Sequence, residues 1–311
     1  MSVASGLAAQ VGFAVETTAG TRVAPSRFVE FNQESLQLNI ERIERMGLRA
    51  GRRMRHGWAA DTRQVSGQVN FDLSAETVGV LFRAAIGAVS STGSAPTVHT
   101  FTPGALPSMT VQVGKPDVGA TVRPFDYIGC RVGSWSLNVQ PNRFATMQLD
   151  LIGEDEDRSQ TLASASYAQS TFFTFANASL EIASSEVCVD SVSITGDNGL
   201  DSYHRTCGTS AGKPTIREAS RRDYGGTLTA DFESLTAYER YVNGTEAALT
   251  LELDAGTSAK LVISGNVRFD GETPTVSGPE NVKQPLPFVF VSGTSDAAAF
   301  TATLSNTDTT P

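Results

Sequence analysis

The chain has 311 residues, of which 40% are hydrophobic and 18% charged, and its formal net charge is −9. This hydrophobic fraction supports a packed core in one large or two smaller domains, and it excludes a disordered or collagen-like chain. The negative charge argues against tight binding of nucleic-acid phosphates over a broad surface, while leaving open a surface that DNA slides past.

The first 33 residues are rich in Gly, Ala and Thr, and we interpret residues 1–33 as an extended N-terminal arm. Apolar and polar residues alternate from Ser35 onward, which predicts a half-buried strand. The same alternation predicts further strands at residues 66–74, 109–113, 127–139 and 145–152. The chain is therefore expected to be mainly β with few helices.

A helical period interrupts this alternation at residues 75–86, where apolar side chains recur at i, i+3, i+4 and i+7. Ser74 is the expected N-cap of this helix and Gly87 its expected end. The acidic stretch GEDED (153–157) is interpreted as a solvated turn.

The second half of the chain repeats the plan of the first. GGTLTADFE (225–233) matches SGQVNFDLS (66–74), and the predicted helix 234–244 matches 75–87. Two tandem modules are expected, although β-rich halves also share short periods by chance. The expected divisions are an arm at 1–33, a first module at 34–157, a linker at 158–182, a second module at 183–296 and a C-terminal tail at 297–311.

The cysteines and the N-terminus bear on the compartment. Cys130, Cys188 and Cys207 are odd in number and match no zinc or CxxC spacing, which favours reduced thiols in a cytoplasmic protein. The stretch MSVASGLAAQVGFAVE lacks the basic and long apolar regions of a signal peptide. No apolar stretch approaches the roughly 20 residues of a membrane helix, so we expect no membrane insertion.

Motifs for catalysis are missing from the sequence. His56, His99 and His204 are far apart and form no HExxH or HxH pattern, and there is no GxSxG elbow. GTSAGK (208–213) lacks the spacing of a phosphate-binding loop, and Pro214 follows its lysine. We therefore predict no enzyme, with no catalytic residue, cofactor or metal site.

The polar faces of the predicted strands carry acidic residues and almost no Lys or Arg, whereas natural sheets usually place lysine on solvent faces. This pattern favours a smooth negative wall, such as that of a water-filled channel, over an ordinary solvent face. The acidic candidates are Asp72, Asp150, Asp231, Glu252 and Asp254.

The strongest basic run of this acidic chain is ERMGLRAGRRMRHG (44–57). Three readings are open: a nucleic-acid contact, a merely solvated loop, or a loop that joins one copy of the protein to another. The guanidinium group favours bidentate pairing with carboxylates, which suits the third reading.

Several stretches together resemble the major tail tube proteins of long, non-contractile-tailed bacteriophages. They are VGFAVETTAGTRVAPSRFVEFNQESLQ (11–37), ERIERMGLRAGRR (41–53), HTFTPGALPSMTVQVGKPD (99–117), YIGCRVGSWSL (127–137) and FDGETPTVSGPE (269–280). The resemblance implies two tandem tail-tube-type β-sandwich modules, each flanked by one short α-helix, that contribute strands to a continuous β-barrel tube. Rings of the protein would stack into a tube for DNA ejection.

The resemblance also implies partners and residue roles. A duplicated chain is expected to form a trimeric, pseudo-hexameric ring, with a ring of six whole chains as the fallback. The expected inter-ring contacts are Arg49, Arg52, Arg53, Arg55, Arg217, Arg221 and Arg222, with acidic patches such as GEDED as their partners. The acidic candidates above would face the lumen, through which DNA passes without specific binding. Assembly in the host cytoplasm with tape-measure, terminator and tail-tip proteins completes this expectation.

Two other classes of function compete with this interpretation. A phage tail-tip or adhesion β-sandwich protein that binds a host surface is the main alternative, and it is expected to expose aromatic patches. A DNA-binding protein that uses the 44–57 loop is expected to show steep salt dependence.

Overall fold

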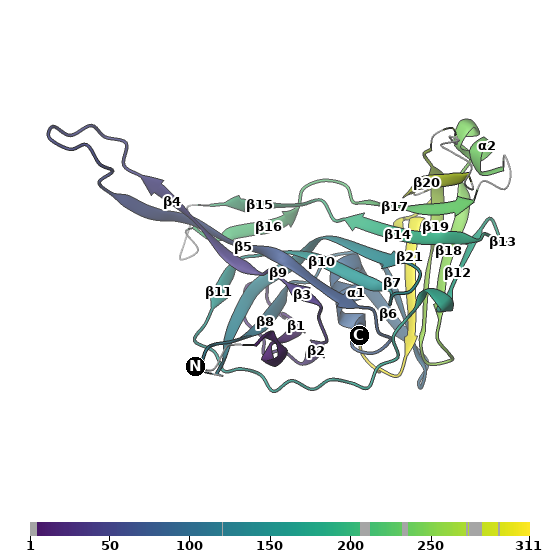
Figure 1. The fold of residues 1–311 in the computed structure, drawn as a ribbon, viewed down its shortest axis with the longest axis horizontal. Helices are drawn as coiled ribbons and strands as arrows, with labels where there is room; N and C mark the ends of the chain where they lie inside the picture. Colours follow the sequence, from purple (N-terminus) through teal and green to yellow (C-terminus); the bar gives the residue numbers. More distant parts are fainter. Residues whose placement is uncertain are drawn as a thin grey trace.

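The computed structural model describes residues 5–119, 121–205, 212–231, 236–271, 273, 282–291 and 293–311 (Figure 1). As predicted, the described chain is mainly β with few helices. Nineteen strands are linked by hydrogen-bonded pairs, and β15 (Leu200–His204) and β16 (Pro214–Glu218) form a separate hairpin. No helix in the described part of the chain is long and apolar enough to cross a membrane.

One continuous antiparallel run of strands joins the two halves of the chain. In spatial order it contains β4 (Gln37–Glu44), β5 (Trp58–Asp72), β10 (Thr146–Gly153), β9 (Val122–Val139), β14 (Val189–Asp197), β17 (Asp223–Asp231), β20 (Lys283–Phe290) and β19 (Lys260–Phe269). The pairing of β9 with β14 is the junction between the halves. Because side chains alternate along each strand, one face of this run is buried and the other is open.

Further strands fold over the buried face. In the first half they are β2 (Arg27–Val29), β1 (Gln10–Val15) and β8 (Met109–Pro116), which continue from β9. In the second half they are β13 (Ser185–Glu186), β12 (Ala178–Ile182) and β18 (Ala247–Asp254), which continue from β19. The remaining strands are β3 (Gln33–Glu34), β6 (Gly87–Thr92), β7 (Thr97–Pro103), β11 (Asp155–Asp157) and β21 (Phe300–Asn306).

Three α-helices are described: α1 (Gly79–Ile86), α2 (Thr236–Asn243) and α3 (Asp296–Ala299), with 3-10 turns η1 (Gly6–Ala8) and η2 (Phe175–Asn177). The first helix ends at Gly87 as predicted, but it begins later than Ser74 suggested. Thr77 has a positive φ of 67°, and its N–H donates to the Asp308 carboxylate at 2.8 Å. The preceding turn is thus held by the C-terminal segment instead of joining the helix.

The terminal segments belong to the sheets instead of standing apart as an arm and a tail. Val11 and Phe13 of β1 are fully buried, and β1 pairs with β8 along its whole length. Near the other end, β21 pairs with β19 on one side and with β7 on the other. Residues 178–182, expected in a linker, form β12. In each case a short period-two pattern is completed by a neighbour distant in sequence.

The core between the halves is aromatic. Trp135, Tyr224 and Phe300 lie edge to face or tilted, with ring centroids 5.0 to 5.8 Å apart. Beside them, the fully buried Asn198 amide donates to Ala85 O and Val132 O, both at 2.9 Å, and its oxygen accepts from the Tyr224 hydroxyl at 2.7 Å. This network fixes the second half against the first.

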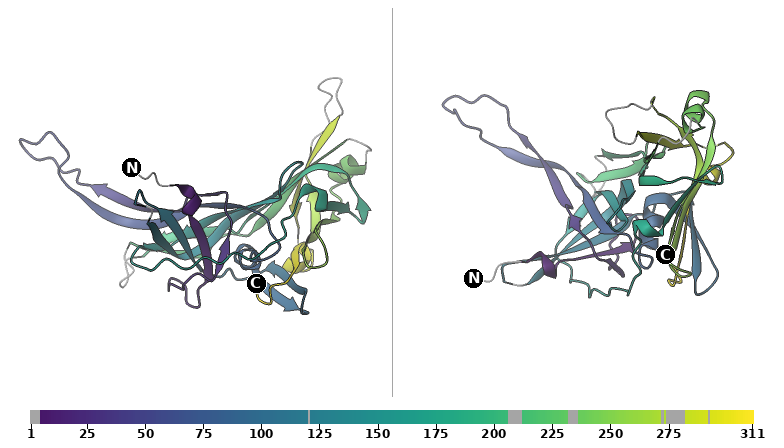
Figure 2. Two further views of the ribbon diagram at one scale, coloured as in Figure 1. Left: turned by 60° about the horizontal axis from the view of Figure 1, so that its bottom comes forward. Right: turned by 45° about the vertical axis from the view of Figure 1, so that its right-hand side comes forward.

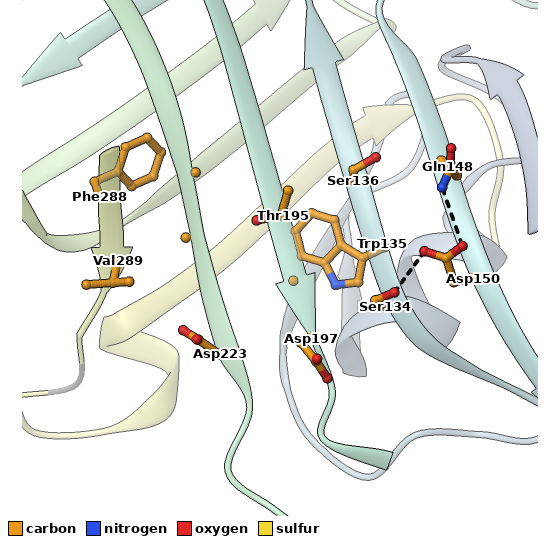
Figure 3. Close-up of a pocket in the computed structure, with 13 residues that line it drawn as sticks. Ser134, Trp135, Ser136, Gln148, Asp150, Thr195, Asp197, Asp223, Phe288 and Val289 are labelled. Atoms are coloured by element: carbon orange, nitrogen blue, oxygen red, sulfur yellow. Dashed lines mark hydrogen bonds between the residues drawn. The ribbon is translucent and has the colours of Figure 1, made fainter. Parts of the chain in front are cut away.

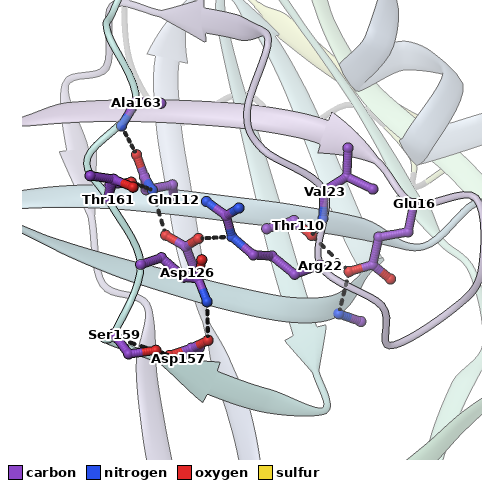
Figure 4. Close-up of polar contacts among 12 residues, drawn as sticks. Glu16, Arg22, Val23, Thr110, Gln112, Asp126, Asp157, Ser159, Thr161 and Ala163 are labelled. Carbon is purple, nitrogen blue, oxygen red and sulfur yellow. Dashed lines mark hydrogen bonds and ion pairs between the residues drawn. The ribbon is translucent and has the colours of Figure 1, made fainter.

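A buried polar cluster fastens the loop after β1 (Figure 4). The Arg22 guanidinium pairs with the Asp126 carboxylate at 2.5 Å, and Asp126 also accepts from the Gln112 amide at 2.6 Å. Nearby, the Glu16 carboxylate accepts from Thr110 Oγ1 and from Gly129 N, both at 2.9 Å. The loop is thereby anchored on β8 and β9, which accounts for the order of a Gly/Thr-rich segment.

The GEDED stretch is not the solvated turn expected from its charge. Asp155–Asp157 forms β11, which pairs with β9, and Asp155 makes ion pairs with Arg63 at 3.2 Å and Lys213 at 2.6 Å. Burial, reinforced by the neighbouring Glu16 carboxylate, raises the pKa of Glu154. The Asp155 carboxylate is paired within the chain and Glu154 is half-buried, which argues against GEDED as the acidic partner expected for another ring.

Candidate functional site

The open face of the long strand run is lined by small polar side chains arranged in rows across the strands. One row runs through Gln68, Asp150, Ser134, Asp197 and Asp223. The next row runs through Asn70, Gln148, Ser136 and Thr195. Figure 3 shows the members of these rows on β10, β9, β14 and β17, which line a shallow concavity. We refer to these residues, together with Asp72 and Asp231 at the strand ends, as the open face.

Three of the acidic candidates lie on this open face. Asp150 accepts hydrogen bonds from Ser134 Oγ at 2.8 Å and from the Gln148 amide at 3.4 Å (Figure 3). Asp72, at the end of β5, accepts from the Asn32 amide at 2.8 Å. Asp231 ends β17 and pairs with Lys283 at 2.7 Å. The face is thus polar to acidic but not free of cations.

Lys283 departs from the sequence expectation of a face without lysine. It stands opposite Asp231 in register and also pairs with Asp190 at 2.6 Å. These two carboxylates raise the pKa of the Lys283 ammonium. The negative charge at this end of the face is therefore locally neutralised.

Glu252 and Asp254 lie elsewhere. Both are on β18, beyond β19, and the pairing of β19 with β21 and β18 carries this part of the sheet away from the open face (Figure 1). Lys260 pairs with Glu252 at 2.6 Å and with Asp254 at 3.6 Å. The structure does not bring them together with the other three acidic candidates.

Two acidic residues of the open face were not predicted from the sequence. Asp197 and Asp223 end β14 and begin β17, and they stand directly opposite each other in register. Like charges at such a position destabilise a sheet, so this pair adds negative charge to the open face at a cost in stability. Both are exposed strand-end residues, and only the register of two strands brings them together.

The basic run forms the tip of a long hairpin arm. β4 extends to Glu44 and β5 begins at Trp58, so residues 41–60 project from the body as a first arm (Figure 2). Its arginines at 49, 52, 53 and 55 are all exposed, and Arg55 pairs with Glu44 of the same arm, at 2.6 Å. Exposed apolar side chains accompany them, including Met46, Leu48 and Trp58.

A second arm is formed by the paired strands β15 and β16, and it lies along the body (Figure 1). Arg217 stacks over the Tyr203 ring of this hairpin, 4.4 Å from its centroid. Arg222, just beyond it, donates to Ile86 O at 2.7 Å and to Gly104 O, and pairs with Glu218 at 2.7 Å. Arg221 is exposed. Because the Arg222 guanidinium is bound by these groups of its own chain, we do not assign it a contact to another ring.

The described residues contain no group of three or more His, Cys, Asp or Glu side chains placed to hold a metal ion. Cys130 is buried and Cys188 exposed, and both are free, whereas Cys207 lies outside the described residues. Burial raises the pKa of the Cys130 thiol, which keeps it protonated. What distinguishes this site is an extended polar face and a projecting arm.

The fold and the site together define a mainly β protein with an open polar sheet face and a projecting hairpin. The family model described as "Phage tail tube protein" matches residues 6–290. The chain therefore belongs to the phage tail tube protein family and is a structural component of the virion tail, in keeping with the resemblance seen in the sequence. No curated protein matches the chain.

Proposed function

We propose that this protein assembles into stacked rings that form the phage tail tube, and that DNA leaves the virion through the lumen. The observation that carries the proposal is the open face. Its polar rows cross the junction between the halves: the row with Asp150 runs from Gln68 on β5 to Asp223 on β17, and the row with Gln148 runs from Asn70 on β5 to Thr195 on β14. A wall of this kind repels phosphates and offers no base-specific contact, so DNA slides along it.

The lumen residues of this proposal are Asp72, Asp150 and Asp231, joined by Asp197 and Asp223. Glu252 and Asp254 are left out because their carboxylates are held by Lys260 on another part of the sheet. Asp150, Asp197 and Asp223 share one row. In a ring, this row would form a band of negative charge around the lumen.

We further propose that the chain is a tandem repeat. The run β4–β5–β10–β9 corresponds to β14–β17–β20–β19, and β2–β1–β8 corresponds to β13–β12–β18. Each half pairs these strands in the same order. Gly67 and Gly226 occupy the same place, because a side chain at either position would clash with a backbone carbonyl oxygen, that of Ser35 or that of Ser193.

The repeat gives a rule for joining copies. β14 is paired on both sides, with β9 and with β17, whereas its counterpart β4 is paired only with β5 among the described residues. If the second half of another copy occupies this free side, three chains complete a ring of six modules. We therefore favour a trimeric, pseudo-hexameric ring, closed as a continuous barrel, over a ring of six chains.

Contacts between rings are assigned to the tip of the first arm. Arg49, Arg52, Arg53 and Arg55 are exposed there and lie beyond the body of the subunit. Guanidinium groups pair well with carboxylates of a facing ring. Tape-measure, terminator and tail-tip proteins are the further partners we propose, and assembly takes place in the host cytoplasm.

The proposal is tested by the reactivity of a cysteine on the open face. Thr195→Cys, in a background with Cys188→Ser and Cys207→Ser, is expected to react with a bulky polymer-linked maleimide as a subunit and to resist it in sedimented assemblies. Small maleimides should still react, since the lumen is filled with water. Equal reaction with the bulky reagent in both states would place this face outside the tube and refute the lumen assignment.

A further inference from the structure

The docking of the second arm inside the chain shows how an arm binds a module. β16 lies against β5 and β10, and Ile216 in its centre is only 4% exposed. The Arg131 guanidinium, on β9, donates to Ile216 O at 3.1 Å. Arg131 stands in register with Ile152 of β10, an apolar residue on the otherwise polar open face. The second arm is thus bound where a basic and an apolar side chain lie side by side.

The first arm has an apolar side chain in the position of Ile216. Asn39 opposite Gln64 in the first half matches Asp197 opposite Asp223 in the second, and Arg42 follows Asn39 by three residues as Leu200 follows Asp197. Arg42 opposite Ala60 therefore corresponds to Leu200 opposite Glu218. Two residues along, Trp58 takes the place of Ile216. Trp58 is 66% exposed within the chain, which leaves a large aromatic surface uncovered.

The second half carries a counterpart of the site that the second arm occupies. On β19 and β20, Arg268 stands in register with Val289, as Arg131 does with Ile152. The matched glycines Gly67 and Gly226 stand opposite Leu151 and Phe288 in register. Ile152 and Val289 are the next residues along these strands, so the two pairs occupy equivalent positions. The Arg268 side chain is 49% exposed, and among the described residues its ion pair is with Asp270, at 3.2 Å.

We propose that the first arm of each copy docks through its base onto the second half of the adjacent copy in the same ring, with Trp58 buried against Arg268 and Val289. The occupant of this site is therefore a second copy of the chain. The inference rests on the proposed ring, and it separates the arm into a base that closes the ring and an arginine-rich tip that reaches beyond it. Figure 1 shows both arms extending in the same direction along the strand run, as this arrangement requires.

Tryptophan fluorescence provides the first test, because the chain has only two tryptophans and Trp135 is 2% exposed. Assembly is expected to shift the emission of the wild-type protein to shorter wavelength as Trp58 leaves water. The Trp58→Phe variant, which retains Trp135, should show no shift. Trp58→Asp should raise the concentration needed for assembly by about tenfold or more, as for a central aromatic residue of an interface. Ala59→Asp, on the opposite face of the same strand, is the matched control and should change it little.

Cross-linking identifies the site that covers Trp58. Subunits carrying Trp58→Cys are mixed with subunits carrying Val289→Cys, both with Cys188→Ser and Cys207→Ser, and are treated with a short bismaleimide after assembly. Cross-linked dimers are expected, and replacing the Val289→Cys partner by Thr303→Cys on β21 should abolish them. Tubes that form without this cross-link and without the emission shift would overturn the docking proposal and leave the tube intact. A wild-type protein that forms no rings or tubes would overturn both.

Discussion

Asn198 offers a sharp test of how the two halves are held together. Its amide group is fully buried and makes three hydrogen bonds, to Ala85 O, Val132 O and the Tyr224 hydroxyl. Asn198→Ala removes all three and leaves two carbonyls and a hydroxyl without these partners. At about 1 kcal/mol for each bond, the free energy of unfolding should fall by about 3 kcal/mol.

The assay is denaturant unfolding followed by the fluorescence of Trp135, in a Trp58→Phe background so that one buried indole reports. Asn39→Ala is the matched control, because the Asn39 amide makes a single exposed hydrogen bond to Ser66, at 2.8 Å. That variant should lose no more than about 0.5 kcal/mol. Equal effects of the two substitutions would refute the role of Asn198 as the polar tie between the halves.

Three further predictions concern the core and the buried charges. Phe300→Ala should lower the free energy of unfolding by about 4 kcal/mol, whereas Phe144→Ala, whose side chain is 48% exposed, should lower it by less than about 1 kcal/mol. Equal losses in denaturant titrations would mean that residues 297–311 form a loosely attached tail. Arg22→Ala should cost about 3 kcal/mol, because the buried Asp126 carboxylate loses its counter-ion; a loss below about 1 kcal/mol in the same titration would contradict this. Burial raises the pKa of Glu154 above 4.5, so the protonated form stabilises the fold, and this stability is lost as the pH rises through the folded-state pKa. Glu154→Gln should therefore exceed the wild type in thermal stability at pH 7 but not at pH 4. A difference that does not change with pH would contradict this explanation.

The sequence predicted the strands that have one buried face. The alternation around Val69 and Leu149 located β5 and β10, since a period of two is visible when one face packs on a core, whereas β4 begins after the buried Leu36 and is largely exposed. The basic run is evident in the sequence, but the extension of β4 and β5 into a projecting arm is not. An exposed hairpin has no buried face, so its side chains carry no alternating pattern.

Other features depended on contacts between distant residues. The start of α1 is displaced because Asp308, 231 positions away, binds the N–H of Thr77. The facing of Asp197 and Asp223 depends on the register of β14 with β17, which no local signal specifies. The acidic GEDED stretch resembled a solvated turn because its cationic partners, Arg63 and Lys213, lie far along the chain. Sequence patterns therefore located the strands better than the electrostatics that depend on their assembly.

The most direct test of the assembly proposed here is electron microscopy of the purified, concentrated protein, followed by averaging of end views. Tubes with a uniform central channel and three-fold density, each chain supplying two similar lobes, are the predicted result. True six-fold density from six whole chains would contradict the pairing of modules inside one chain. Discrete particles that form no tube even with the tail-tip complex present would contradict the tube itself.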